Sequence, residues 1–212
     1  MGGTNGGRSA SWCPPTTARQ LQWDWTQAGK EVVQPCPIGA TGIARWICGE
    51  STDEQSAVAS WALPQPDMSN CRSISMSNLE GQVRKEDPEN VLASAMAYFT
   101  RTKDLYGGDL EIAVATMRTV ASRLQYRLQQ SSSKGAFHNK ESFIRQVLQN
   151  VFRATNNILW DAQRQAWLDL SRDAQMKIGT QLILALEEFA FLLGGVLNQP
   201  DVVLESSDVL SK

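Results

Sequence analysis

The sequence of 212 residues is short of histidine, the side chain that most often serves as a catalytic base. Its single histidine, His138, stands beside a serine-rich stretch, where we expect an exposed side chain with no catalytic role. A phosphate-binding loop is also missing, because Gly107-Gly108 is not followed by Lys-Ser or Lys-Thr. These absences argue against an enzyme, and we expect no catalytic residue, no metal site and no cofactor.

An excess of either charge is lacking as well, since 20 Lys and Arg face 22 Asp and Glu, a net charge of -2. Nucleic acids and anionic membranes select basic surfaces, so neither is an expected partner. The longest apolar stretch, from Ile178 to Leu197, is interrupted by Gln181, Glu187 and Glu188. Carboxylates are costly at bilayer depth, so the stretch predicts a core helix rather than a membrane span. The two glutamates are then a solvated or locally paired face rather than a metal or catalytic site.

The first ten residues lack the apolar segment of a signal peptide, and their Gly, Ser and Asn content is typical of a flexible linker. We assign residues 1–11 to a linker or to the start of a fragment.

Composition changes sharply near residues 72–78. All four cysteines and five of the seven tryptophans precede residue 72, together with most of the prolines. This part has no sustained helical period, so we expect short strands and loops. The remainder is rich in Ala, Leu, Gln and Arg with apolar residues at a 3.6-residue period, which predicts helices. The expected fold class is therefore mainly α: a small disulfide-stapled β/loop module followed by an antiparallel multi-helix bundle.

The four cysteines follow the spacing C-x22-C-x11-C-x22-C. A segment of about sixty residues buries little apolar surface, and two disulfides would each stabilise it by roughly 3–4 kcal/mol. Zinc sites usually place cysteines in close pairs, which this spacing lacks, so disulfides are favoured over a zinc site or free thiols. Four cysteines allow three pairings, and spacing alone does not choose between them. The residues concerned are Cys13, Cys36, Cys48 and Cys71.

Alternation predicts a strand over Gln22–Thr26 with the rings of Trp23 and Trp25 on one face, and a second strand over Ile43–Cys48. Gly39 is interpreted as a turn residue.

Gly42 is interpreted as a turn residue as well.

In so small a module, large aromatic side chains are more often core than a ligand platform, although a pocket for a peptide is the alternative. The tryptophans in question are Trp23, Trp25, Trp46 and Trp61.

These residues carry a family resemblance. The segment resembles the hormone-receptor motif (HormR) module of latrophilins and other adhesion receptors over most of residues 12–71, through Cys13-Pro14, Trp23, Gly29, Cys36-Pro37-Ile38-Gly39, Gly42-Ile43-Ala44, Cys48, Trp61 and Pro66-Asp67-Met68-Ser69-Asn70-Cys71.

The resemblance implies that Cys13 pairs with Cys48 and Cys36 with Cys71. The related module of secretin-type receptors binds peptide hormones but has six cysteines, whereas this one has four. Hormone binding is therefore the alternative function rather than the leading one.

Local signals predict four long helices in the second part. The first has Asp87 as N-cap and Pro88 at its first position and runs to about Thr102. Asp109 caps the next, which runs to about Gln130. The last two cover about Asn139–Trp160 and Arg172–Leu193, ending at Gly194-Gly195. Their inward apolar residues are expected to be Val91, Leu92, Ala95, Met96 and Phe99; Leu110, Ala113, Met117, Val120, Ala121, Leu124 and Leu128; Phe143, Val147, Val151 and Ile158; and Ile178, Leu182, Ala185, Leu186, Phe189 and Leu193.

Between these helices, Ser131–Gly135 is expected to be a loop. After them, Val202–Glu205 has the pattern of a strand without a partner.

This part resembles the helical subdomain A of the GAIN domain of latrophilins over about residues 75–200. The segments that carry the resemblance are Tyr106-Gly107-Gly108-Asp109, Trp167-Leu168-Asp169-Leu170, Gly179-Thr180-Gln181-Leu182 and Leu186-Glu187-Glu188-Phe189-Ala190-Phe191-Leu192-Leu193.

The resemblance divides the chain into a linker (1–11), a HormR module (12–74), a GAIN subdomain A (75–200) and the start of an absent β subdomain (201–212). It implies a non-enzymatic extracellular fragment of a latrophilin-like adhesion G-protein-coupled receptor, itself soluble, on the outer face of the plasma membrane. Its role would be structural support and protein interaction in signalling and adhesion. In that family, autoproteolysis belongs to the subsequent β subdomain. The implied partners are that subdomain and, through the full-length receptor, extracellular adhesion proteins such as teneurins.

Overall fold

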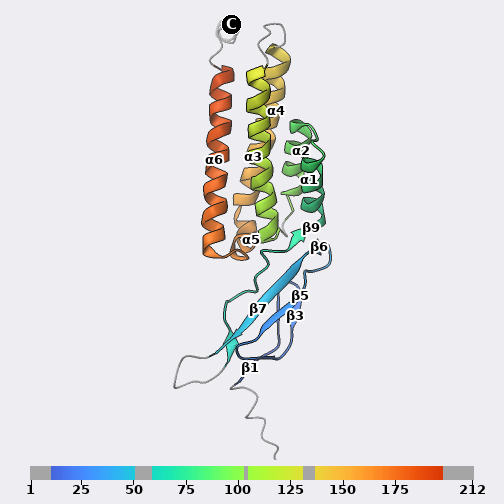
Figure 1. The fold of residues 1–212 in the computed structure, drawn as a ribbon, viewed down its shortest axis with the longest axis vertical. Helices are drawn as coiled ribbons and strands as arrows, with labels where there is room; N and C mark the ends of the chain where they lie inside the picture. The colour runs from blue at the N-terminus through green and yellow to red at the C-terminus, as the bar shows by residue number, and fades with distance from the viewer. Residues whose placement is uncertain (1–10, 51–58, 103–104, 131–136, 198–212) are drawn as a thin grey trace, which may run out of the picture.

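A computed structural model describes residues 11–50, 59–102, 105–130 and 137–197, without the side chains of residues 137–140 and 196–197. A small strand-rich module lies at one end of an elongated molecule and a helical bundle forms the rest (Figure 1). The mainly α fold class predicted from the sequence is confirmed. The predicted linker at 1–11, apart from Ser11, lies outside the described residues, as do the predicted Ser131–Gly135 loop, the His138 side chain and the predicted strand at Val202–Glu205.

The first module, which we call the cysteine module, is built from short antiparallel pairs of strands. Their bounds are β1 (Trp12–Cys13) with β4 (Thr26–Gln27), β2 (Thr16–Ala18) with β3 (Leu21–Trp23), β5 (Glu31–Pro35) with β7 (Ile43–Gly49), β8 (Ser60–Trp61) with β7, and β6 (Ala40–Thr41) with β9 (Arg72–Ser73). The predicted strand at Ile43–Cys48 is confirmed within β7.

Two disulfides hold these strands together. Cys13 is bonded to Cys48 and Cys36 to Cys71, each across 35 residues. No free cysteine occurs in this part of the chain, so a cysteine-bound zinc ion has no thiolate ligands here. Gly42 lies in the left-handed region (φ 105°), and a Cβ there would stand 2.1 Å from the carbonyl oxygen of Asn70. The turn next to the Cys36–Cys71 bond therefore requires glycine.

The predicted strand over Gln22–Thr26 is wrong. Strand β3 ends at Trp23 and β4 begins at Thr26, whose hydroxyl donates to the carbonyl oxygen of Asp24 at 2.9 Å. Asp24 and Trp25 belong to neither strand, and across this interruption Trp23 is buried (1% exposed) while Trp25 is 49% exposed. The two rings do not share a face.

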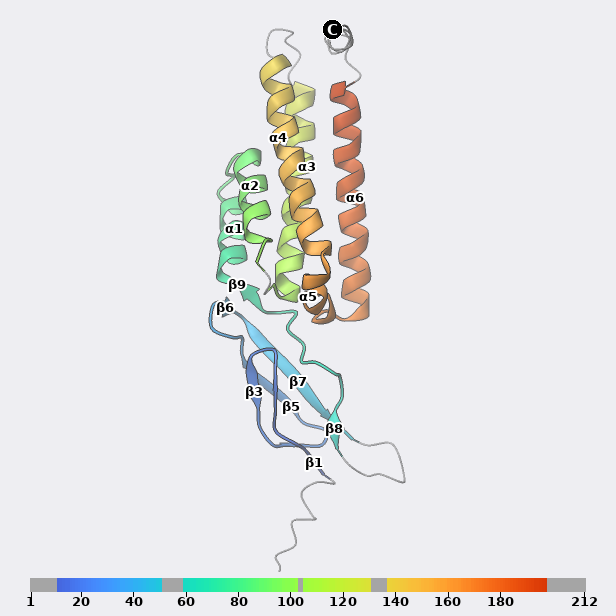
Figure 2. The ribbon, with the colours of Figure 1, turned by 180° about the vertical axis from the view of Figure 1, so that it is seen from behind.

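The bundle consists of α1 (Ile74–Arg84), α2 (Glu89–Phe99), α3 (Gly107–Gln130), α4 (Phe137–Leu159), a 3-10 turn η3 (Asp161–Gln163), α5 (Arg164–Leu168) and α6 (Arg172–Leu197). Helix α3 lies centrally and contacts α1, α2, α4, α5 and α6, while α6 lies at the edge of the bundle in both views (Figures 1 and 2). Most of the predicted inward residues are buried in one core, including Leu92, Met117, Val151 and Phe189.

Four predicted helix ends are wrong. Glu86 takes a left-handed conformation (φ 60°) and closes α1, so Asp87 belongs to that closing turn and Pro88 is the N-cap of α2. Helix α2 stops at Phe99, because Thr100 forms its C-cap and the predicted end at Thr102 lies beyond it.

Helix α3 begins at Gly107, two residues before the predicted cap Asp109. At the other end of the bundle, α6 continues through Gly194-Gly195, since neither glycine takes the left-handed conformation that ends a helix. Val91, predicted to face the core, is 41% exposed.

Arg172–Gly195 of α6 is, by length and composition, apolar enough to span a bilayer. In this structure it packs along α3, and its carboxylates are placed at the surface, with Glu187 exposed and Glu188 half-buried.

Candidate functional site: the junction of the two modules

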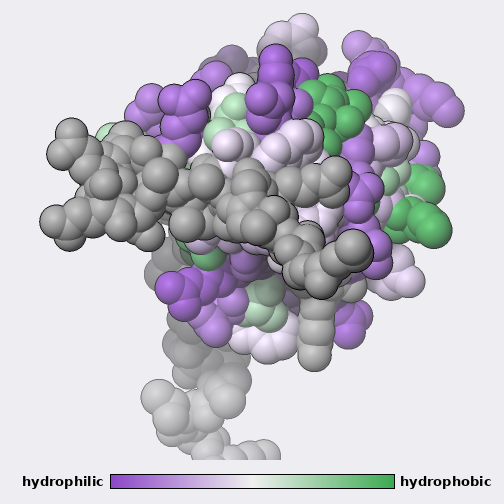
Figure 3. Space-filling model, turned by 90° about the horizontal axis from the view of Figure 1, so that it is seen from below, coloured by the Kyte–Doolittle hydropathy of each residue, from purple (hydrophilic) through white to green (hydrophobic). Residues whose placement is uncertain are grey.

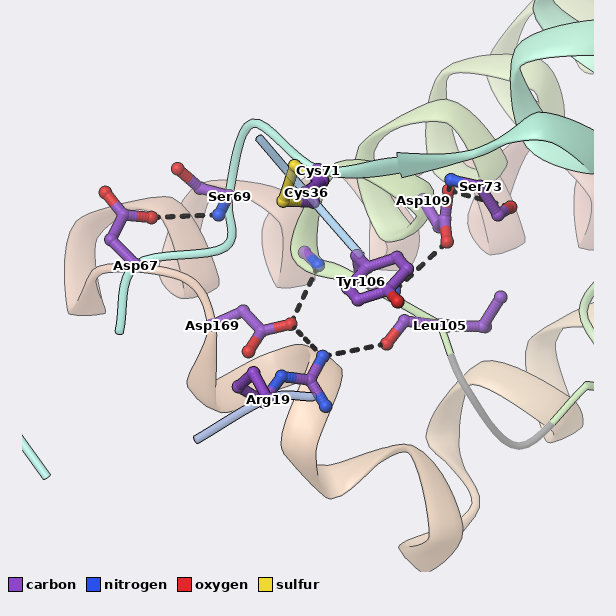
Figure 4. A network of polar contacts seen from close by, with 11 residues as sticks. Arg19, Cys36, Asp67, Ser69, Cys71, Ser73, Leu105, Tyr106, Asp109 and Asp169 are labelled. Atoms are coloured by element: carbon purple, nitrogen blue, oxygen red, sulfur yellow. Dashed lines mark hydrogen bonds and ion pairs between the residues drawn. A yellow bond between two sulfur atoms is a disulfide. The ribbon is translucent and has the colours of Figure 1, made fainter. Parts of the chain in front are cut away.

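The cysteine module and the bundle meet at a buried polar network rather than through a flexible linker (Figure 4). Strand β9 ends at Ser73, and α1 begins at the next residue with the Ser73 hydroxyl accepting a hydrogen bond from the Met76 amide. The last cysteine, Cys71, is two residues upstream. The disulfide, the strand and the helix thus form one continuous connection.

Arg19 reaches across the junction from the cysteine module. Its guanidinium Nη2 lies 2.5 Å from Oδ2 of Asp169 and donates to the carbonyl oxygen of Leu105 at 3.2 Å. The guanidinium also stands over the ring of Tyr106, 5.2 Å from its centroid, a cation–π geometry. All three contacts are to the bundle, so one side chain from the β2–β3 turn links the two modules.

The backbone at that turn explains how Arg19 is presented. Arg19 (φ 52°) and Gln20 (φ 63°) are both left-handed and connect β2 to β3 by two residues, as in a type I′ hairpin turn. Such turns normally contain asparagine or glycine, and other side chains there are disfavoured. The strain is balanced by the contacts that Arg19 makes across the junction.

Asp169 is the acceptor at the centre of the network and is fully buried. Besides Arg19, its Oδ2 accepts from the Gly107 amide at 3.3 Å, while its Oδ1 has no hydrogen-bond partner among the described residues. Burial raises the pKa of Asp169 to about 7, and the neighbouring Arg19 charge and hydrogen bond oppose that rise. The negative charge of Asp67 adds a smaller contribution in the same direction as burial.

A second buried carboxylate, Asp109, ties the start of α3 to the start of α1. Its Oδ2 accepts from the Tyr106 amide at 3.0 Å, and its Oδ1 accepts from the amide and hydroxyl of Ser73 at 2.8 and 3.2 Å. The Asp109 carboxylate, in the first turn of α3, therefore accepts from the Tyr106 amide just before the helix, and for this reason the helix begins before Asp109. Burial raises the pKa of Asp109, against the lowering effect of these hydrogen bonds.

Two glycines let the modules approach this closely. A Cβ on Gly107 would stand 2.8 Å from Cδ2 of Leu170, and one on Gly108 would stand 2.6 Å from the carbonyl oxygen of Cys71. No other residue fits between α3 and the disulfide-linked strand without displacing backbone.

The tryptophans form the core of the cysteine module. Trp46 and Trp61 stack at 4.4 Å, and Trp23 meets Trp46 edge-on at 5.3 Å. Each of these three indoles donates to a backbone carbonyl oxygen: Trp46 to Leu63, Trp61 to Pro14 and Trp23 to Ala18. Trp25 stands apart at the surface. Three of the four candidate aromatics are thus engaged with one another and with the backbone.

Seen from the end occupied by the cysteine module, apolar side chains form separate patches among hydrophilic ones (Figure 3). Within the described residues, no group of three or more His, Cys, Asp or Glu side chains is placed to hold a metal ion.

Sequence reasoning missed the junction network, although several of its members stand in segments singled out for the family resemblance. Gly107 belongs to the run Tyr106–Asp109 and Asp169 to the run Trp167–Leu170, and the structure brings these runs together. Arg19 carried no signal, because it lies outside every strand and helix that the sequence predicts.

The arrangement defines a class of protein: a disulfide-stapled module fused without a linker to a helical bundle, as in the extracellular parts of adhesion receptors. Residues 72–194 match the family model "GAIN: AGRL2-4 GAIN subdomain A". The chain belongs to this family and is a latrophilin-like adhesion G-protein-coupled receptor fragment.

Similar proteins extend the match into the cysteine module. Latrophilin Cirl of Drosophila ananassae is 28% identical over 249 residues, which covers 95% of this chain and 14% of that protein. Latrophilin Cirl of Drosophila persimilis is 29% identical, covering 93% and 14%. Adhesion G protein-coupled receptor L1 of Homo sapiens is 29% identical over 197 residues, covering 89% and 13%. The chain thus spans about one seventh of the length of these relatives.

Proposed function

We propose that this chain is a non-enzymatic extracellular unit that supports an adhesion receptor and contributes protein-interaction surfaces to it. The observation that carries the proposal is the junction network, in which Arg19, Asp169 and Asp109 fasten the disulfide module to the bundle. A network of buried charge-assisted hydrogen bonds favours one relative orientation of two modules. Such a unit holds the receptor segments on its N-terminal and C-terminal sides at fixed positions relative to each other.

The disulfides support an extracellular location for this part of a plasma membrane receptor, since disulfides persist in oxidising compartments. Mass spectrometry of the secreted protein without reductant tests this part. We expect two disulfides and no thiol that reacts with an alkylating reagent; four reactive thiols would contradict an extracellular location.

The partner within the receptor is expected to be the β-rich subdomain on the C-terminal side of this helical one. The surface that supports docking is the outer side of α6, where Met176, Ile183 and Phe191 are 64%, 59% and 78% exposed. Exposed large apolar side chains on one helix face are typical of an interface. Contacts with adhesion proteins such as teneurins would be made by the full-length receptor and are proposed only at that level.

Replacing Ile183 and Phe191 together by serine in the full-length receptor tests this docking. We expect surface delivery to fall several-fold, because the β-rich subdomain loses its apolar contact. The matched control is Tyr126→Ser, which removes a similarly exposed aromatic from α3 and should leave delivery unchanged. Equal delivery of both variants would remove the α6 surface from the proposal.

The alternative, a peptide-hormone-binding module, has less support. It requires Trp23, Trp25, Trp46 and Trp61 to line a pocket, whereas three of them fill the core. A change in tryptophan fluorescence when the protein is titrated with an extracellular peptide would support this alternative.

A further inference from the structure

A hollow of about 620 Å³ opens beside the junction, between the cysteine module and the C-terminal end of α2. Ile38 stands on its cysteine-module side with a fully exposed side chain, and Tyr98 stands on its α2 side, 69% exposed. Phe99 packs its ring edge-on to Tyr98 at 5.6 Å and lines the hollow as well. Two modules therefore contribute apolar side chains to one concave surface.

A second hollow, of about 410 Å³, lies between α2 and α4. It shares Tyr98 and Arg101 with the first and is lined further by Asn150, Arg153 and Asn157. The two hollows lie next to each other through these shared residues, and we call the surface that they form together the junction groove.

The described charged residues of the junction groove have one sign. Among the described residues that line the two hollows, Arg101 and Arg153 are the charged ones, and none is a carboxylate. Both arginines are exposed, and neither has an ion-pair partner in the described parts of the chain. The Arg101 side chain makes no hydrogen bond there either, and the Arg153 side chain makes only a long one, 3.5 Å to Oδ1 of Asn150.

Three other arginines of the bundle form ion pairs with glutamates. Arg84 is bonded to Glu80, Arg127 to Glu89 and Arg145 to Glu141. Unpaired arginines beside exposed aromatic and aliphatic side chains are the combination that recurs at the centres of protein interfaces.

We propose that the junction groove binds an extended acidic segment of another protein, with carboxylates at Arg101 and Arg153 and an apolar side chain between Ile38 and Tyr98. Arginine binds carboxylate through two parallel hydrogen bonds, which gives such a site preference for acidic sequences. Ser94, which also lines the second hollow, and Arg101 are separated by roughly 10 Å along α2 and its C-terminal turn, the length of about three extended residues, and the groove continues beyond them to Ile38. The proposal rests on the protein-interaction part of the proposed function.

Binding of immobilised hexapeptides to the fluorescently labelled protein tests the proposal. The array holds all arrangements of two or three Glu with Leu, Phe, Tyr and Ser, and a matched set with Lys in place of Glu. We expect retention by acidic peptides that contain an aromatic or Leu, weakening with added salt. Arg101→Glu and Tyr98→Ser should each reduce it about tenfold or more, as for a central interface residue.

Arg118→Glu is the matched control, because it reverses an exposed arginine of α3 outside both hollows and should keep wild-type retention. Circular dichroism melts of all variants confirm folding. No retained acidic peptide, preference for the Lys set, or equal retention by Arg101→Glu and wild type would overturn the proposal. None of these outcomes bears on the disulfide and α6 tests, so failure here is distinguishable from failure of the proposed function.

Discussion

Replacing Asp169 by asparagine should change how the stability of this protein depends on pH. Burial raises the pKa of Asp169 from 3.8 to about 7, so the folded protein holds this proton more tightly than the unfolded chain does. Asp169 therefore contributes stability that is fully present below about pH 4 and is lost as the pH rises through about 7. Asparagine keeps the shape and the acceptor oxygen but does not titrate.

The size of the effect is set by the two pKa values. At about 1.4 kcal/mol per pKa unit, the rise from 3.8 to about 7 corresponds to roughly 4 kcal/mol in total. Between pH 5 and pH 8, the interval that is easiest to measure, the wild type should lose roughly 3 kcal/mol relative to Asp169→Asn. In a protein of this size that difference is about 6–12 °C in melting temperature.

Urea denaturation followed by circular dichroism, at several pH values from 5 to 8, provides the measurement. The difference between wild type and variant isolates Asp169, since Asp109 and the other carboxylates titrate in both proteins. Glu111→Gln, which changes an exposed carboxylate of α3, should run parallel to wild type. If Asp169→Asn also runs parallel to wild type across this range, the buried carboxylate does not bind a proton near neutral pH and the reasoning is refuted.

Two further substitutions test packing, each against a matched control. Gly108→Ala should destabilise the protein by about 2 kcal/mol or more, because its Cβ would stand 2.6 Å from the carbonyl oxygen of Cys71; Gly81→Ala, in open space on α1, should stabilise it by about 0.5–1 kcal/mol in the same melts. Trp23→Ala removes a buried ring and should cost about 3–5 kcal/mol, whereas Trp25→Ala should cost less than about 1 kcal/mol; equal losses in urea denaturation would contradict the assigned core.

The long helices were predictable because their apolar stripes recur over many turns. The stripe through Leu110, Met117, Val120 and Leu124 in α3 is buried throughout. Helix α1 was missed, because only Met76 and Leu79 are buried along its 11 residues and two positions do not establish a period.

Helix α5 was missed for a different reason. It has five residues, of which only Ala166 is fully buried, and so short a segment has no periodicity to read.

The junction network was beyond sequence reasoning because its members are polar, single and far apart. Arg19 and Asp169 are separated by 150 residues, and nothing in the neighbourhood of either indicates the other. Ion pairs across a fold depend on the final packing of its elements. Trp25 shows the same limit at short range, since the strand is interrupted at Asp24 and Trp25 and the alternation that would have placed its ring inside does not hold.

The run Tyr106–Asp109 has a physical meaning that motif comparison alone does not supply. The Tyr106 ring contacts the Arg19 guanidinium, and the Gly107 amide donates a hydrogen bond to Asp169. Gly108 has no Cβ and therefore leaves room for the carbonyl oxygen of Cys71, and the Asp109 carboxylate accepts from the Ser73 amide at the start of α1. Four consecutive residues therefore serve four separate contacts, three of them with the cysteine module or the strand that leaves it. A substitution in this run acts on both modules at once, and for that reason the pair behaves as one structural unit rather than as two domains in series.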